Sequence, residues 1–244
     1  RESIENIKEK RFGTRRAPVK WNFKDLKYIY EKQKRMELYE RILSSSKEWR
    51  EEIIDCLKEH EINIIISCLQ TYSIRRDIIR DLKQELSGYA FSNGLMRFAI
   101  IAKETKVAHA QVILDWPDKG DSIPFNREYA SAFNTGKSRK DITYYSGPLK
   151  DINFADSIFY ANMRHTTLLQ GADIILGATR DFVETALEKK QIGIGVKYLI
   201  KLRNRFLGSP NNIYGRGINV YGEEPFKEKI KLFIEKYLID ETAV

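Results

Sequence analysis

The chain has 244 residues, with 42 Lys and Arg against 34 Asp and Glu, a formal net charge of +8 and a pI near 9.3. Hydrophobic residues at 42% and charged residues at 31% exclude a disordered chain, a collagen-like chain and a small disulfide scaffold. No apolar run reaches the roughly 18 residues that cross a bilayer, so no membrane partner is expected. Two cysteines, Cys56 and Cys68, cannot form a metal cluster by themselves and predict a reducing, cytoplasmic compartment.

The first hundred residues are patterned mainly as helices. Apolar residues recur at helical spacing over residues 23–43, and the serines at 44–46 predict a break followed by the cap of a second helix at 47–60. Residues 62–69 form an apolar run of strand length. A long helix is expected over residues 73–103, with bends at Gly88 and Gly94.

The second clear strand is predicted at residues 107–115. Ala110 and Val112 fall on its apolar face, whereas Ile113 and Asp115 fall on the other face. Further along the chain, the pattern predicts the following segments: a loop at 116–121, short strands at 142–145 and 152–154, and helices at 166–190, 195–207 and 225–239. Strands separated by long helices indicate an α/β fold, with a mixed sheet covered by helices on both faces.

Positive charge is concentrated near the C-terminus. Residues 189–222 contain seven basic residues and no Asp or Glu: Lys189, Lys190, Lys197, Lys201, Arg203, Arg205 and Arg216. Such a stretch suits the phosphates of a nucleic acid, because neutralising them releases counterions. A solvated surface in a lysine-rich chain explains the charge equally well.

The most informative segment is residues 168–178, where nearly every position is apolar or small and yet Asp173 lies in the middle. The composition predicts a helix that is buried on more than one side. An unpaired buried carboxylate costs several kcal/mol, on the order of a domain's whole stability, so Asp173 should have a partner. A metal cation and a structural Arg are both compatible with this helix.

Two further acids follow strands in the predicted pattern. Asp115 ends the strand at 107–115, and Asp156 follows the short strand at 152–154. Alone, Asp115 could start a turn, and Asp156 could cap a turn or a helix. Together with Asp173, they are typical of a site that binds Mg²⁺ or Mn²⁺ through oxygen ligands. We therefore expect the carboxylates of Asp115 and Asp173 to face one another, with Asp156 nearby.

Three segments resemble the domain of unknown function 3800 family, whose members look like ribonuclease H-type nucleases. The segments are residues 112–115, 154–157 and 169–178, the last of which contains Leu169, Gln170, Gly171, Ala172 and Asp173. The hallmark of the family is Leu-Gln-x-Ala-Asp followed by small and apolar residues. Lys20 and Trp21 also resemble a Lys-Trp pair of the family. The resemblance spans about residues 18–187.

The resemblance implies a ribonuclease H-like domain at residues 1–190 and a basic helical extension at 191–244 packed on it. The family opens with a strand ending in Asp-Glu-Ser-Gly, which does not occur here. Because the chain starts at Arg1 and residues 1–16 are not a signal peptide, we expect the first strands to be missing. The family also has an acid before its Lys-Trp pair, where this sequence has Pro18.

The implied activity is hydrolysis of DNA or RNA phosphodiester bonds by two metal ions. Asp115, Asp156 and Asp173 would be the ligands of Mg²⁺ or Mn²⁺. The residues expected to hold the nucleic acid are Lys20, Lys197, Lys201, Arg203 and Arg205. The sequence has no Gly-x-Ser-x-Gly, no complete dinucleotide fingerprint and no P-loop lysine. The alternative is a non-catalytic module that binds nucleic acid or protein on a degenerate nuclease scaffold.

Overall fold

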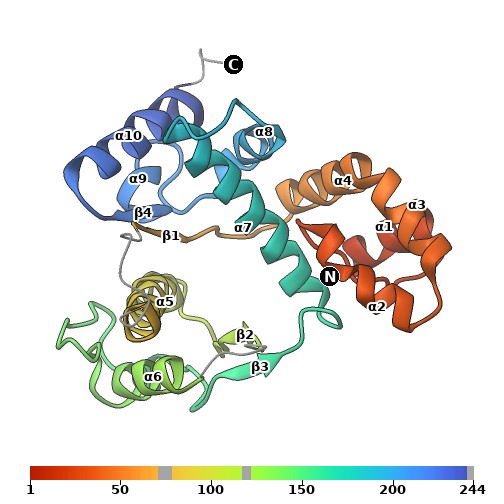
Figure 1. Cartoon of the computed structure of the whole chain (residues 1–244). Helices are drawn as coiled ribbons and strands as arrows, with labels where there is room; N and C mark the ends of the chain where they lie inside the picture. Colours follow the sequence, from red (N-terminus) through yellow and green to blue (C-terminus); the bar gives the residue numbers. More distant parts are fainter. Residues whose placement is uncertain (71–78, 117–121, 241–244) are drawn as a thin grey trace. The chain divides into compact units, whose positions relative to one another are not determined.

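The structure, a computed structural model, describes residues 1–70, 79–116 and 122–240. The chain divides into two compact units, each built from separated stretches of sequence. Unit 1 contains Arg1–Ile64, Asn162–Ile213 and Glu228–Val244, and unit 2 contains Ile65–Ala161 and Tyr214–Lys227. Figure 1 labels their helices and strands. The start of the helix expected at residue 73 and most of the loop expected at 116–121 lie outside the described residues.

Unit 1 consists mainly of helices. Its elements are α1 (Glu2–Phe12), the 3₁₀-helix η1 (Phe23–Leu26), α2 (Lys27–Lys32), α3 (Met36–Ser44), α4 (Ser46–Glu59), α7 (Thr167–Ala186), α8 (Ile194–Lys201) and the 3₁₀-helix η3 (Arg203–Arg205). The helix α10 (Glu224–Ile234) begins in unit 2 and continues in unit 1, where the π-helical turn η4 (Glu235–Ile239) follows it.

Helix α4 confirms the helix predicted at 47–60. Trp49, Ile53, Ile54 and Leu57 share one face and are buried, because residues three and four apart lie on the same side of a helix. Ser45 is the N-cap residue of α4, as predicted, but its side chain makes no capping hydrogen bond. The hydroxyl of Ser45 donates a hydrogen bond of 2.8 Å to the carbonyl of Arg41, so it ends α3 instead.

The single helix expected over residues 23–43 is divided into three elements. Lys34 has a positive φ of 55° and ends α2. The N–H of Arg35 donates to the carbonyl of Tyr30 at 2.8 Å, which closes the last turn around this left-handed residue. Sequence periodicity missed the break because the apolar spacing continues across it.

Helix α7 confirms the helix predicted at 166–190 but is buried on one side only. Gly171, Ile174 and Ala178 face the core of unit 1, whereas Leu168 and Leu176 are exposed. Helix α8 packs closely on the buried side of α7. A Cβ added at Gly195 would lie 2.8 Å from the carbonyl oxygen of Ala178, so only glycine permits this approach.

Unit 2 contains the four strands of the described chain, with the helices α5 and α6 and shorter helical segments around them. Its elements are β1 (Ile66–Leu69), α5 (Ile79–Glu104), β2 (Ile113–Asp115), α6 (Ile123–Thr135), the 3₁₀-helix η2 (Leu149–Ile152), β3 (Phe159–Ala161), most of the interrupted helix α9 (Ile213–Arg216) and β4 (Ile218–Tyr221). Strand β1 pairs in parallel with β4, and β2 pairs in parallel with β3.

The core of unit 2 joins α5, α6 and the segment before β3. Its buried residues include Leu95, Ala99, Ala132, Tyr144 and Phe154. Helix α5 packs against both β1 and α6. It is 26 residues long, but no helix in the described part of the chain is long and apolar enough to span a membrane.

The structure is a mixed α/β fold that is mostly helical, with two small parallel pairs of strands. The single ribonuclease H-like mixed sheet that the sequence analysis expected is not found among the described residues. One reason lies at the strand expected over 152–154, where Asn153 takes a left-handed φ of 64° directly after η2. This conformation interrupts an extended run, so only the isolated bridge between Ala110 and Phe154 extends the β2–β3 pairing.

A buried lysine links α1 to α7 inside unit 1. Lys8 is 1% exposed, and its Nζ donates a hydrogen bond of 3.1 Å to Oε1 of Gln170. Gln170 is also 1% exposed, and its Nε2 donates to the carbonyl of Met163 at 2.9 Å. Burial lowers the pKa of Lys8 to about 8, and the charge of Glu5 opposes this change.

We expect the free energy of unfolding to rise between about pH 8 and pH 10.5, the folded and ordinary pKa values of Lys8. In this interval the unfolded chain keeps the proton that the folded chain has released, so raising the pH favours folding. The gain should be roughly 3 kcal/mol, because each pKa unit corresponds to about 1.4 kcal/mol. Replacing Lys8 with Met should stabilise the protein at pH 7 and remove this rise, as measured by urea unfolding at several pH values.

The matched control is Lys10→Met, which removes an exposed lysine of the same helix. It should follow the wild-type pH dependence. An unchanged pH dependence in Lys8→Met would contradict the buried, weakly basic state of Lys8.

Candidate carboxylate site and basic residues

Asp173 is held by a backbone hydrogen bond. It lies on α7, is half-buried, and accepts a hydrogen bond at Oδ2 from the N–H of Trp21 at 2.7 Å. The two residues are 152 positions apart in the sequence. A charge-assisted bond of this kind is about twice as strong as one between neutral groups. Asp173 therefore fixes the segment before η1 against α7.

The same segment is packed tightly on α7. A Cβ added at Gly177 would lie 1.9 Å from Cγ of Trp21, so any larger residue there would displace the indole. The indole also meets the ring of Tyr198 from α8 edge to face, with ring centroids 6.2 Å apart. The small residues of α7 thus serve close packing against an aromatic ring.

Arg50 completes the environment of Trp21. Its Nη2 donates a hydrogen bond of 2.5 Å to the Trp21 carbonyl, and its guanidinium lies 5.2 Å and 4.9 Å from the ring centroids of Trp21 and Trp49. Its Nε is buried and has no hydrogen-bond partner among the described residues. Burial lowers the pKa of Arg50, and nearby Tyr198, Asp181 and Asp173 oppose this change.

Sequence reasoning did not single out Arg50. The signal was present, because Arg50 lies in the middle of the apolar face that Trp49, Ile53 and Ile54 define on α4. A basic residue in that position must bury its charge among partners. The negative charge of Asp173 favours the charged form of Arg50. A structural Arg, one of the two partners that the sequence allowed for Asp173, is therefore near this carboxylate.

Asp115 lies at the C-terminal end of β2 and is exposed. The strand predicted at 107–115 is shorter than expected, because only Ile113–Asp115 is a strand. The predicted division of faces holds at Ala110 and Val112, which are buried, and at Ile113, which is 45% exposed, but Ala108 is exposed. In the register of the pair, Ile113 lies opposite Phe159 and Asp115 lies opposite Ala161. Asp115 therefore shares its face of the sheet with an exposed apolar pair.

The pairing of β2 with β3 does not bring Asp156 to Asp115. Asp156 precedes β3, and its Oδ1 accepts a hydrogen bond of 3.1 Å from the hydroxyl of Ser157. Because Ala161 lies opposite Asp115 and the strands are parallel, Asp156 lies upstream, between Phe154, which bridges to Ala110, and Phe159, which lies opposite Ile113. The two acids lie at opposite ends of the same two-stranded sheet.

No group of three or more His, Cys, Asp or Glu residues in the described ranges is arranged to hold a metal ion. The described residues therefore do not fit a metal site made of three carboxylates. Asp173 belongs to unit 1, and Asp115 belongs to unit 2. That they share an ion stays a prediction. Two carboxylates are compatible with Mg²⁺, which usually keeps several waters and binds substrate phosphates.

The basic residues expected to bind nucleic acid differ in their surroundings. Lys201 forms ion pairs of 2.8 Å with Glu51 and 2.9 Å with Asp55, both on α4. Lys20 lies 3.7 Å from Asp25. No ion pair of Lys197 occurs in the part of the chain that the structure describes, and Lys197 is exposed.

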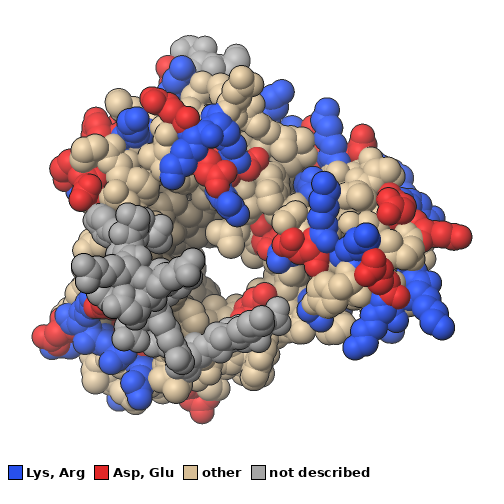
Figure 2. All heavy atoms as spheres, in the orientation of Figure 1, with Lys and Arg blue, Asp and Glu red and all other residues tan. Residues whose placement is uncertain are grey.

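Arginines 203 and 205 both have partners. Nε of Arg205 donates to the carbonyl of Lys58 at 2.8 Å, and Arg203 also interacts with another group. Figure 2 shows basic and acidic side chains interspersed on the visible face of the molecule. The basic stretch at residues 189–222 contains no acid of its own, but it is partly neutralised by Glu51 and Asp55 on α4.

Comparisons with protein-family models, curated proteins and solved structures found no significant match for this chain. The resemblance to the domain of unknown function 3800 family therefore depends on the motif segments alone.

We expect Lys197 and Lys201 to contribute differently to nucleic-acid binding. Replacing Lys197 with Ala should reduce the slope of log affinity against log salt by about 0.9 on duplex DNA, because one phosphate contact is lost. Replacing Lys201 with Ala should leave this slope nearly unchanged, since Glu51 and Asp55 already hold its ammonium group. Fluorescence anisotropy of a labelled duplex, titrated at several KCl concentrations, measures both slopes.

Equal losses of slope in the two variants would show that the ion pairs on α4 open when nucleic acid binds. Absence of any salt-dependent binding would contradict the nucleic-acid interface as a whole.

Proposed function

We propose that this protein is a divalent-metal-dependent nuclease that hydrolyses phosphodiester bonds of DNA or RNA, with Asp115 and Asp173 as carboxylate ligands. The observation that carries the proposal is the hydrogen bond between Asp173 and the N–H of Trp21. It joins two of the segments on which the family resemblance depends, residues 19–21 and 169–178. The proposal includes a ribonuclease H-like arrangement around β2 and α7.

In this proposal the residues of the chain fix the positions of the carboxylates. The N–H of Trp21 orients the Asp173 side chain, and the close contact of Gly177 with the indole keeps the Trp21 backbone in place. The last residue of a paired strand supplies Asp115. A bound Mg²⁺ or Mn²⁺ would activate water and stabilise the leaving oxygen. Lys197 supplies an exposed charge for a substrate phosphate.

The ligand set that we propose excludes Asp156. It precedes β3, whereas Asp115 lies opposite the last residue of β3, and its carboxylate accepts a hydrogen bond from Ser157. Its role is local, next to the turn that leads into β3. Asp156 therefore provides a control for the two proposed ligands.

A second candidate function is a module that binds nucleic acid without cutting it. The observation that favours it is the lack of any group of three metal-ligating side chains among the described residues. In this case Asp173 serves only to hold Trp21 and to balance Arg50. Binding would then occur equally well in Mg²⁺ and in EDTA.

We expect Asp115→Asn and Asp173→Asn each to lower Mg²⁺-dependent cleavage by more than roughly 100-fold. Loss of even a group that only supports a metal ligand typically costs about 10- to 100-fold. Asp156→Asn should retain wild-type activity. Labelled single-stranded, double-stranded and hybrid substrates, incubated with Mg²⁺, Mn²⁺ or EDTA, provide the measurement.

Asp115→Asn is the cleaner variant because Asp115 is exposed, whereas Asp173→Asn also weakens the bond to Trp21. Cleavage that survives Asp115→Asn would refute its role as a ligand. Salt-dependent binding without cleavage in any metal would support the second candidate instead.

A further inference from the structure

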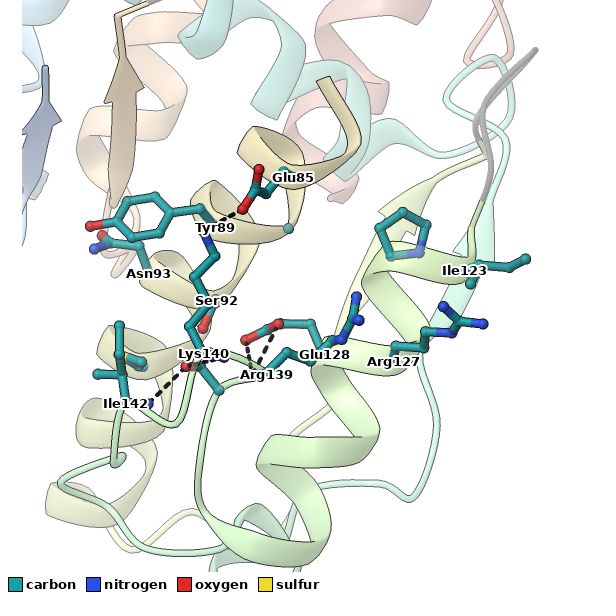
Figure 3. Close-up of a pocket in the computed structure, with 14 residues that line it drawn as sticks. Glu85, Tyr89, Ser92, Asn93, Ile123, Arg127, Glu128, Arg139, Lys140 and Ile142 are labelled. Carbon is teal, nitrogen blue, oxygen red and sulfur yellow. Dashed lines mark hydrogen bonds and ion pairs between the residues drawn. The ribbon is translucent and has the colours of Figure 1, made fainter. Parts of the chain in front are cut away.

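Unit 2 contains a cavity of about 650 Å³ that is not lined by Asp115, Asp156 or Asp173. It lies between α5, the N-terminal half of α6 and the turn at residues 138–142 (Figure 3). Small-molecule sites typically have volumes of about 300–1,000 Å³. The cavity is therefore large enough for a mononucleotide.

A buried carboxylate lines this cavity. Glu128 is 6% exposed, and its two oxygens share one donor, the N–H of Arg139, at 3.2 Å and 3.3 Å. No Lys or Arg in the described ranges forms an ion pair with Glu128. Figure 3 shows the carboxylate directed toward the α5 side of the cavity. An ionised carboxylate has about four acceptor sites, so Glu128 has capacity for two further donors.

Positive charge surrounds the opening of the cavity. Arg127, Arg139 and Lys140 contribute to its lining and are exposed. Lys140 extends along the cavity and forms an ion pair of 2.6 Å with Glu85 on α5. The guanidinium groups of Arg127 and Arg139 have no ion pair among the described residues. Guanidinium groups bind phosphate through two parallel hydrogen bonds.

The remaining lining suits a planar ring. Tyr89 on α5 lies on the side of the cavity away from Arg127 (Figure 3), and Met96 and Pro124 add apolar surface. The ring of Tyr89 is supported by Tyr221, with centroids 4.8 Å apart. An aromatic side chain can stack on any base, so it supplies affinity without selecting one.

We propose that this cavity binds a guanine nucleotide. The N1–H and N2–H groups of guanine are adjacent donors that match the two oxygens of Glu128. Adenine and cytosine present an acceptor beside their amino group, and uracil presents one donor between two acceptors. The phosphate lies against Arg127 and Arg139. The ligand is a free mononucleotide or the 5′-phosphorylated end of a strand, because both present the same groups.

This site is separate from Asp115 and Asp173, and binding to it requires no cleavage. Titration calorimetry in EDTA therefore tests it independently of the proposed nuclease. We expect GMP to bind about tenfold or more tightly than AMP, since a hydrogen bond to a charged group contributes this much discrimination. Inorganic phosphate should bind more weakly than either. A 5′-phosphorylated oligonucleotide that begins with guanosine, compared with GMP, identifies the natural source.

Two variants separate base recognition from phosphate recognition. Glu128→Gln retains an acceptor for the Arg139 N–H but places a donor at the guanine edge, so the preference for GMP over AMP should disappear. Arg127→Gln should weaken GMP and AMP by the same factor. Lys150→Gln, which changes an exposed lysine on η2 outside the cavity, should bind like the wild type.

Thermal melts show whether each variant is folded, and Arg127→Gln remains informative if Glu128→Gln is unstable. Equal binding of GMP and AMP would overturn the proposal, as would a guanine preference that survives in folded Glu128→Gln. No binding of GMP at about 1 mM would also overturn it.

Discussion

The backbone of Trp21, through its N–H and its C=O, is the constraint on which the arrangement of unit 1 depends. Asp173 on α7 accepts its N–H, and Arg50 on α4 donates to the carbonyl of the same residue. Two helices that are far apart in sequence thereby bind the same residue of an irregular segment. The N–H and the C=O of Trp21 are part-buried, and each has a charged partner, which removes the cost of leaving it unpaired.

This constraint explains why an acid occurs in the middle of an apolar helix and bears on the proposed function. A carboxylate that accepts one backbone hydrogen bond can also ligate a metal ion, because each oxygen has two lone pairs. The bond to Trp21 would then fix the orientation of a ligand, as supporting groups do in metal sites. The charge of Arg50 would compete for the same carboxylate, which would weaken metal binding in isolation.

The sequence predicted features that depend on local periodicity. The helices at α4 and α7 and the two faces of the strand at Asp115 follow from spacing within single segments. It could not predict features set by pairing between distant segments. The register of β2 with β3 separates Asp156 from Asp115, and acids on α4 pair with Lys201. The left-handed backbone at Lys34 has no signal in hydrophobic spacing.

Hydrogen exchange at the Trp21 amide tests most directly whether Asp173 holds the backbone N–H of Trp21. In the wild type we expect the Trp21 amide to be protected, and Asp173→Ala should remove this protection. The amide of Ile174, inside α7, should remain protected in both proteins and thus show that the helix is intact. Rapid exchange at Trp21 in the wild type, or protection that persists in Asp173→Ala, would contradict the account.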